Sequence, residues 1–245
     1  MIESAHNDNF KKLLSLTSAK GLKEEGLFLL SGEKLIREFL QKPHLKIVSE
    51  ILAPTHTSLA DAPPAFLSAA LFAQIDVLGT HFNILVVEQP SVPVLTSTDV
   101  AHYKPEGIEL VAPIGDPGNL GALIRSCEAF AVPRVILSQE AAHPFLPKCV
   151  KASAGSVLRV PLARGPVLAE FPQDSIALDQ KGISINEFQW PQNGLLVVGE
   201  EGSGFTSSGF TSRTSIRIPT CGVESLNAVV AASIALSRIP QRYIP

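Results

Sequence analysis

Short apolar runs alternate with segments of helical spacing over the second half of the chain. From about Gly107 onward, the candidate strands are residues 108–114, 134–138, 157–160, 176–178, 195–199 and 216–218. Strands that alternate with helices are typical of a mostly parallel sheet covered by helices. We therefore predict an α/β domain over residues 107–245.

The first 90 residues show a smaller α/β pattern. Helical spacing covers residues 10–16 and 33–40, and short apolar runs that resemble strands occur at 27–30, 47–48 and 84–87. Residues 91–106 follow, and their first part is rich in Pro, Ser and Thr with little helical pattern. We interpret residues 1–90 as a separate small domain and residues 91–106 as a linker.

Composition excludes several classes of protein. Of the 245 residues, 45% are hydrophobic and 18% are charged, which is ordinary for a soluble globular protein. The N-terminus lacks the pattern of a signal peptide, and no apolar run approaches the ~18 residues of a membrane span. Cys127, Cys149 and Cys221 have no CxxC spacing, which favours a reducing, cytoplasmic compartment. The six histidines are scattered, so we expect no metal site.

Basic residues concentrate in one window of a chain whose net charge is −3. Between residues 117 and 165 there are six basic residues (Arg125, Arg134, Lys148, Lys151, Arg159 and Arg164) against two acidic ones (Glu128 and Glu140). This window is compatible with a local face for a polyanion, and equally with ordinary surface charge.

The first group of candidate functional residues, at 115–125, lies where a strand passes into a helix. Asp116 or Asn119 can cap that helix, and Arg125 lies off its apolar face. A capped helix with a solvated arginine explains this pattern. The two glycines of the first turn are unfavourable in a helix, and they favour close approach of a ligand or of another chain segment.

The second group is the Gly-rich segment 199–204, which follows an apolar strand. It matches neither a Walker loop nor GxGxxG, and its two adjacent carboxylates argue against phosphate binding. A plain turn is one interpretation. In another, Glu201 accepts hydrogen bonds from backbone N–H groups and holds the loop rigid, or it acts on a ligand directly.

The third group, at 218–227, precedes the last apolar helix. Ser225 is a good candidate for the N-cap of that helix. Asn227 then falls in the first turn, where its amide can offer both a donor and an acceptor to a ligand.

Together these groups resemble the three motifs of the SpoU/TrmH family of SPOUT RNA methyltransferases. The matching residues are Asn119-x-Gly121-x-x-x-Arg125, Gly199-x-Glu201-x-x-Gly204, and Ile218-Pro219 followed by Ser225-Leu226-Asn227. Residues 148–155 also resemble the stretch between the first two motifs. The similarity covers the chain from about Ile108 onward, and the first domain resembles, more loosely, the family's accessory substrate-binding domain, which is akin to a small ribosomal-protein fold.

The resemblance implies methyl transfer from S-adenosylmethionine to a ribose 2′-hydroxyl of RNA, with ribosomal RNA as the first candidate and tRNA as the second. It also implies a SPOUT-type parallel sheet with a C-terminal trefoil knot, and a homodimer. By position, the conserved polar residues are Asn119, Arg125, Glu201, Ser225 and Asn227. The positions that contact the cofactor are Gly199, Gly204, Ile218, Cys221 and Leu226.

Arg125 is the candidate for contact with the 2′-hydroxyl or the adjacent phosphate. A guanidinium stays protonated, so we expect it to clamp the phosphate and stabilise the developing alkoxide, while a phosphate oxygen or water removes the proton. Four residues depart from the family pattern, namely Ala131, Glu200, Thr220 and Cys221. Two alternatives remain: a non-catalytic RNA-binding module, and a dinucleotide-dependent oxidoreductase, whose GxGxxG signature is missing.

Overall fold

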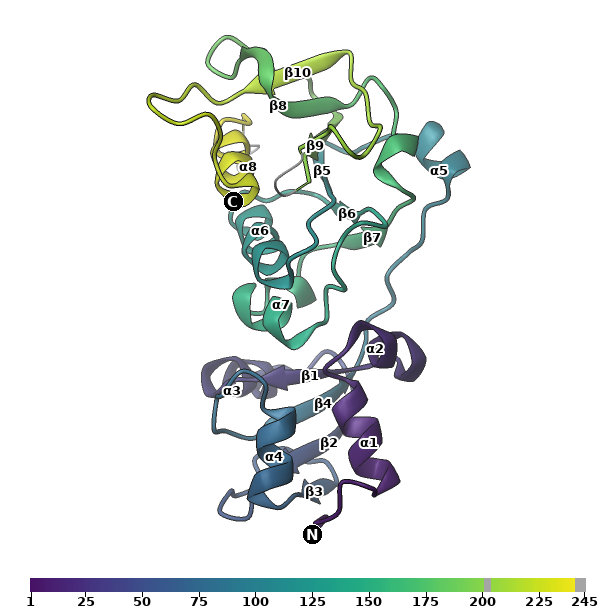
Figure 1. Ribbon diagram of the computed structural model, residues 1–245, viewed down its shortest axis with the longest axis vertical. Coiled ribbons are helices and arrows are strands. Elements are labelled where there is room, and N and C mark those ends of the chain that lie inside the picture. The colour runs from purple at the N-terminus through teal and green to yellow at the C-terminus, as the bar shows by residue number, and fades with distance from the viewer. Residues whose placement is uncertain (201–203, 241–245) are drawn as a thin grey trace. The chain divides into compact units, whose positions relative to one another are not determined.

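The computed structural model describes residues 1–200 and 204–240 and divides the chain into two compact units. The first unit contains Met1–Ser91 together with His143–Gly155. The second contains Val92–Ala142 together with Ser156–Pro245. Figure 1 shows the two units, coloured along the chain.

The first unit is a mixed four-stranded sheet with helices. Along the sheet the strands are β1 (Leu27–Ser31), β4 (Ile84–Glu88), β2 (Ile47–Leu52) and β3 (Pro64–Phe66). β4 is antiparallel to both of its neighbours, whereas β3 is parallel to β2. The helices of this unit are α1 (Asp8–Ser15), α2 (Ala19–Glu25), α3 (Glu33–Gln41), α4 (Ala69–Ile75) and α7 (Pro147–Ala152).

Helix α7 belongs to the first unit although it lies far away in the sequence. It packs against β1, and the ring of Phe145, just before the helix, lies 5.3 Å from that of Phe28. Both phenylalanines are almost completely buried. This aromatic contact explains why residues 143–155 belong to the first unit, an assignment that the pattern of apolar residues did not predict.

The second unit is built on a six-stranded sheet in which every strand pair is parallel. Along the sheet the strands are β10 (Thr214–Arg217), β8 (Ile176–Ser184), β9 (Gly194–Val198), β5 (Ile108–Ala112), β6 (Val135–Leu137) and β7 (Leu162–Arg164). The predicted α/β class with a parallel sheet is therefore confirmed. The predicted trefoil knot stays a prediction.

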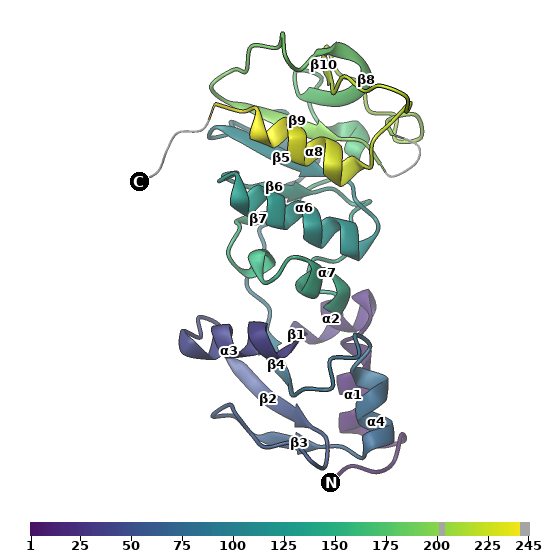
Figure 2. The ribbon, with the colours of Figure 1, turned by 90° about the vertical axis from the view of Figure 1, so that its left-hand side faces the viewer.

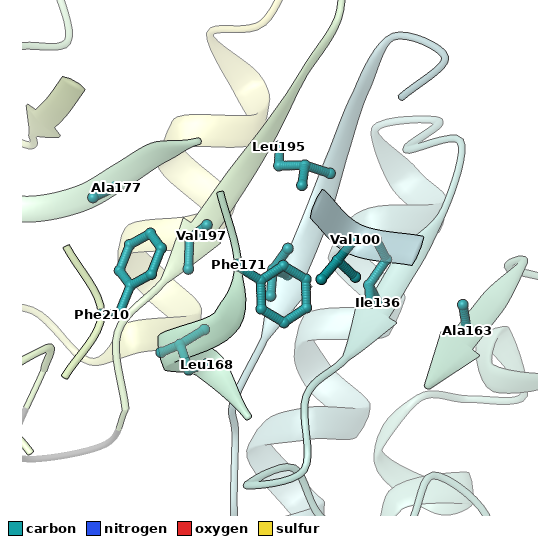
Figure 3. Packing of buried hydrophobic residues seen from close by; sticks show 10 residues of the cluster. Val100, Ile136, Ala163, Leu168, Phe171, Ala177, Leu195, Val197 and Phe210 are labelled. Atoms are coloured by element: carbon teal, nitrogen blue, oxygen red, sulfur yellow. The ribbon is translucent and has the colours of Figure 1, made fainter. Parts of the chain in front are cut away.

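Helices cover both faces of this sheet. In Figures 1 and 2, α6 (Pro117–Ala129) and α8 (Ala228–Ser237) lie on one side, and α5 (Ser97–Ala101) lies on the other. On the α5 side, Val100 belongs to a buried cluster with strand residues such as Val197 and with Phe171, as Figure 3 shows. Val111 of β5 is part of the same cluster. Fully buried strand residues between two helical layers explain why these strands are apolar without alternation.

Residues 92–106 are an ordered part of the second unit, so their interpretation as a linker was wrong. The backbone N–H of Leu95 donates to the carbonyl of Arg164 at 2.7 Å, which adds this segment to the edge of β7. Helix α5 then begins with a capping box between Thr96 and Asp99. It buries Val100 completely, so the segment is held by apolar packing despite its Pro- and Ser-rich start.

A buried polar contact fixes the end of the same segment to the sheet. The hydroxyl of Tyr103 donates to the carboxylate of Glu109 at 2.7 Å, and Arg134 donates to the Tyr103 oxygen. Glu109 is only 2% exposed. Desolvation, reinforced by the neighbouring carboxylate, raises the pKa of Tyr103 to about 12, so this tyrosine stays protonated and a donor at neutral pH.

One predicted strand is also absent. Residues 157–160 form part of a 3-10 turn, Ser156–Leu158, and the strand of this region is β7, which begins at Leu162. The N–H groups of Arg159 and Val160 both donate to the carbonyl of Ser156 and close the turn. Val157 and Val160 are buried, so their apolar character reflects packing of a turn and not of a strand.

Within residues 1–200 and 204–240, no helix has the length and hydropathy needed to cross a membrane. Within the same ranges, no three His, Cys, Asp or Glu side chains are grouped so that they could hold a metal ion.

Candidate functional site

The second unit contains a cavity of about 530 Å³ at the edge of the sheet where β8, β9 and β10 end. Its walls come from four segments: the middle of β8, the loop after β9, the loop after β10, and the first turns of α8. In a parallel sheet, the carboxyl ends of the strands meet at one edge, where open α/β sheets bind their ligands. The residues that line the cavity include Leu178, Asp179, Gln180, Lys181, Gly199, Glu200, Gly204, Arg217, Ile218, Thr220, Glu224, Ser225, Leu226 and Asn227.

Four of the five residues predicted to contact a cofactor line this cavity. They are Gly199, Gly204, Ile218 and Leu226. The fifth, Cys221, is exposed and lies beside the lining residue Thr220, but it is not itself part of the wall. The structure thus brings together residues that are up to 27 positions apart, from Gly199 to Leu226.

The Gly-rich loop after β9 is a closed turn. The N–H of Glu200 donates to the carbonyl of Gly204 at 2.8 Å, and the N–H of Gly204 donates back to the carbonyl of Glu200 at 3.0 Å. A Cβ at position 199 would lie 2.9 Å from the Cα of Gly204, so any side chain there would push the turn open. Gly204 has φ +60°, a backbone conformation that favours glycine. Both glycines are therefore required by the shape of the loop.

Asn227, and not the predicted Ser225, is the N-cap of α8, so the helix begins at Ala228, two residues later than expected. The Oδ1 of Asn227 accepts from the N–H of Val229 at 2.9 Å and from that of Val230 at 3.4 Å. Because the acceptor of this amide is committed to the helix, the Nδ2 group is left as a donor toward the cavity that Asn227 lines. Ser225 lines the cavity too and is exposed.

Asn119 and Arg125 lie on α6 and outside the residues that line the cavity. The side chain of Asp116 accepts from the N–H of Asn119 at 2.8 Å, which fixes the start of this helix. Arg125 is exposed, and no hydrogen bond or ion pair joins it to the part of the chain that the structure describes. Its guanidinium is therefore available to an external anion.

Helix α6 is held beside α8, as Figures 1 and 2 show. The hydroxyl of Ser233 on α8 lies 2.8 Å from that of Ser126 on α6, one residue after Arg125. The helix that carries Arg125 thus packs directly on the helix whose first turn closes the cavity. Glu201, the remaining predicted polar residue, lies outside the described residues, whereas its neighbour Glu200 accepts from the hydroxyl of Ser207 at 3.0 Å.

The basic residues of the window at 117–165 are divided between the two units, with Lys148 and Lys151 in the first and the arginines in the second. Arg159 donates to Glu128 at 2.9 Å, and this pairing holds the pKa of the Glu128 carboxyl below its usual value. Lys151 donates to the backbone carbonyl of Leu78 at 3.3 Å within the first unit. Arg125 differs from these residues in having no such partner within the described ranges.

One wall of the cavity was missed by the analysis of the sequence. Residues 178–181 in the middle of β8 line it, although only Leu178 fell within a predicted strand. The signal that could have revealed them is Gly182, because a glycine within a strand often marks a bulge or a close backbone approach.

Comparisons with known proteins agree with this geometry. The SpoU rRNA Methylase family matches residues 109–237. A Bacillus subtilis protein, 23S rRNA (guanosine(2553)-2′-O)-methyltransferase RlmP, is 29% identical over 95% of this chain and 96% of its own length. A Syntrophobacter fumaroxidans protein, Ribosomal RNA small subunit methyltransferase G 2, is 36% identical over 96% of this chain, which spans 48% of that relative.

Among solved structures, the SpoU methyltransferase AviRb from Streptomyces viridochromogenes, in complex with its cofactor AdoMet, has a TM-score of 0.79. It is 22% identical, and the alignment covers 96% of this chain and 97% of that one. This likeness supports the fold over both units. Because the family match extends over more than half of the 245 residues and spans all three motifs, the chain belongs to the SpoU rRNA Methylase family.

Proposed function

We propose that the protein transfers a methyl group from S-adenosylmethionine to a ribose 2′-hydroxyl of RNA. The observation that carries this proposal is the cavity at the carboxyl edge of the sheet, whose wall contains most of the motif residues while α6, with Arg125, packs on the adjoining α8. The activity in the printed name of the Bacillus subtilis relative, which aligns over nearly its whole length, supports the same reaction.

The cavity fits the proposed cofactor. A volume of about 530 Å³ lies within the range of ~300–1,000 Å³ that is typical of small-molecule sites. Leu178, Ile218 and Leu226 offer an apolar surface to a purine, and Gly199 and Gly204 contribute wall without side chains. When bound, S-adenosylmethionine supplies a methyl group that its sulfonium already activates.

The protein's own residues then have to bind and orient the RNA. Arg125, which stays protonated, clamps the phosphate next to the target ribose and stabilises the oxygen as it loses its proton. Asn119 and Ser225 position the ribose, and the Nδ2 of Asn227 donates a hydrogen bond to it. Glu201 braces the loop after β9. The proton leaves to a phosphate oxygen or to water, and correct alignment supplies much of the rate enhancement.

We further propose ribosomal RNA as the substrate, with tRNA as the second candidate. The printed names of both curated relatives refer to ribosomal RNA, and that of the Bacillus subtilis protein specifies a guanosine 2′-hydroxyl. The first unit serves as the RNA-binding accessory domain, the protein acts as a homodimer, and it works in the cytoplasm. A non-catalytic RNA-binding role would leave the cavity and the Nδ2 donor of Asn227 without a purpose.

Two measurements test the proposal. Mapping of ribose 2′-O-methylation in RNA from cells with and without this protein should reveal one position that loses its methyl group in the deletion strain. Isothermal titration calorimetry should show binding of S-adenosylmethionine. Absence of both a missing methyl group and cofactor binding would overturn the proposed function.

The role of Arg125 is tested by Arg125→Lys. This variant should lose about 100-fold in kcat, because a lysine keeps the charge but not the paired donors of a guanidinium. Arg213→Lys is the matched control, since Arg213 is exposed and does not line the cavity. An Arg125→Lys enzyme with near-normal turnover and unchanged RNA affinity would exclude the clamp.

A further inference from the structure

The cavity wall formed by β8 is a five-residue bulge. Ser215 of β10 pairs with Ala177 of β8, yet the next residue, Ile216, pairs with Ile183. Residues 178–182 therefore have no partner on β10. Leu178 still pairs with Val198 of β9, and four of the five residues of the bulge line the cavity.

Two features hold the bulge in one shape. A Cβ on Gly182 would lie 2.3 Å from the backbone carbon of Ser215 and 2.4 Å from the nitrogen of Ile216, so only glycine fits at this position. Within the bulge, the Oδ1 of Asp179 accepts from the N–H of Lys181 at 2.9 Å. Among residues 1–200 and 204–240, the second oxygen of Asp179 has no hydrogen bond. The position of Asp179 is therefore fixed by the backbone of the bulge and by the hydrogen bond to one carboxylate oxygen. The other carboxylate oxygen is available to a ligand.

The charged residues of the cavity wall differ in exposure. Lys181, Arg217 and Glu224 are exposed, so water and salt screen their charges. Asp179 and Glu200 are only half-buried, and both are carboxylates. Glu200 already accepts from Ser207 within its own loop. The charges that solvent screens least are therefore the two carboxylates, and they make the electrostatic potential inside the cavity negative. Asp179 is the carboxylate that the bulge contributes.

A negative field distinguishes the proposed cofactor from the product that it leaves behind. Transfer moves the methyl group from sulfur to the ribose oxygen, the hydroxyl proton leaves, and the positive sulfonium becomes a neutral thioether. We propose that Asp179 is a specificity-determining residue that favours binding of the sulfonium form and weakens binding of the thioether, S-adenosylhomocysteine. This inference rests on the proposed function. Its consequence is easier exchange of spent cofactor for fresh cofactor.

The test is Asp179→Asn, which removes the charge and keeps an oxygen that can accept from the N–H of Lys181. Isothermal titration calorimetry with the full chain should show S-adenosylmethionine binding weakened about fivefold to tenfold, by loss of one Coulomb attraction at short range. Binding of S-adenosylhomocysteine should change by less than about twofold, because this ligand lacks the positive sulfonium that the Asp179 carboxylate would attract. Glu187→Gln is the matched control, since Glu187 is an exposed acid outside the cavity wall.

The outcomes separate this inference from the proposed function. If Asp179→Asn weakens both ligands equally, or changes neither, the selective role of Asp179 is overturned while cofactor binding by the wild type stands. If the wild type binds neither ligand, the proposed function fails first. Added salt should narrow the difference in affinity between the two ligands in the wild type more than in Asp179→Asn, because the attraction is electrostatic.

Discussion

Two junctions between a strand and a helix at the same edge of the sheet differ greatly in construction. Residues 113–116 join β5 to α6, whereas residues 218–227 join β10 to α8. The first junction is short, and its Pro113 and Ile114 are buried. In the second junction, Ile218 and Leu226 are half-buried and the other residues are exposed.

The difference shows how one fold separates positioning from binding. The short junction has too few residues to carry a site of its own. The polar residues next to it, Asn119 and Arg125, therefore lie on helix α6 itself. The long junction places its polar residues before the helix, and it forms much of the cavity wall. Both helices begin at a capping side chain, Asp116 for α6 and Asn227 for α8. Only Asn227 also lines the cavity, so only this cap combines a structural role with a proposed chemical one.

The largest expected effect comes from separating the two roles of Asn227. Asn227→Asp keeps a cap of equal quality but loses the Nδ2 donor, so stability should change by less than about 0.5 kcal/mol. Methyl transfer should fall about 100-fold in kcat/KM, since a donor becomes a negative charge beside the phosphates of the RNA. Urea unfolding and a methyl-transfer assay measure the two quantities.

Asp116→Asn is the matched control at the short junction. It preserves the cap in the same way and should leave both stability and turnover near wild type. Asn227→Ala should instead lose turnover and about 1 kcal/mol of stability together. Full activity in Asn227→Asp would show that the two caps are equivalent and that the comparison between the junctions is mistaken.

A smaller effect is expected from Gly199→Ala, at the start of the loop that faces the long junction across the cavity. The added methyl group meets the Cα of Gly204 at 2.9 Å and must displace the turn. Affinity for S-adenosylmethionine should fall about tenfold or more by calorimetry, the equivalent of ~1.4 kcal/mol. In the control Gly209→Ala, whose φ is +68°, stability should fall by about 1 kcal/mol while cofactor affinity holds. Equal affinity in both variants would contradict a close-packed turn.

The sequence predicted the short junction better than the long one. The helix at 117–129 follows from Asp116 and Pro117, which are local signals for a helix start. The start of α8 was predicted two residues too early, because both Ser225 and Asn227 can cap a helix and only tertiary contacts select between them. The bulge at 178–182 was not predicted at all, since its shape depends on pairing with β10, more than thirty residues later in the chain.

The motif residues themselves were grouped through family resemblance rather than through periodicity. Gly199, Ile218 and Leu226 lie on separate segments, and no local pattern places them around one cavity. The pattern also failed where apolar residues pack outside a strand. Val157 and Val160 are buried in a turn. Val100 is a buried residue of helix α5, which lies in the segment that was interpreted as a linker. The strand predicted at 157–160 implied burial of its valines but the wrong conformation, whereas the linker interpretation anticipated neither the burial nor the helix at Val100.

The smallest expected effect lies just after the C-terminal end of α6, the helix that follows the short junction. It tests whether the backbone at this end is strained. Ala131, which follows that helix, has φ +51°, a left-handed conformation that costs a residue with a Cβ about 1–2 kcal/mol. Ala131→Gly removes this cost but adds up to ~1 kcal/mol of unfolded-state entropy, so a net gain of about 0.5–1 kcal/mol in unfolding free energy is expected. Ala129→Gly, at an exposed position within α6, should instead lose about 1 kcal/mol. Urea unfolding of the two variants should therefore give shifts of opposite sign. A loss of stability in both would show that position 131 is unstrained.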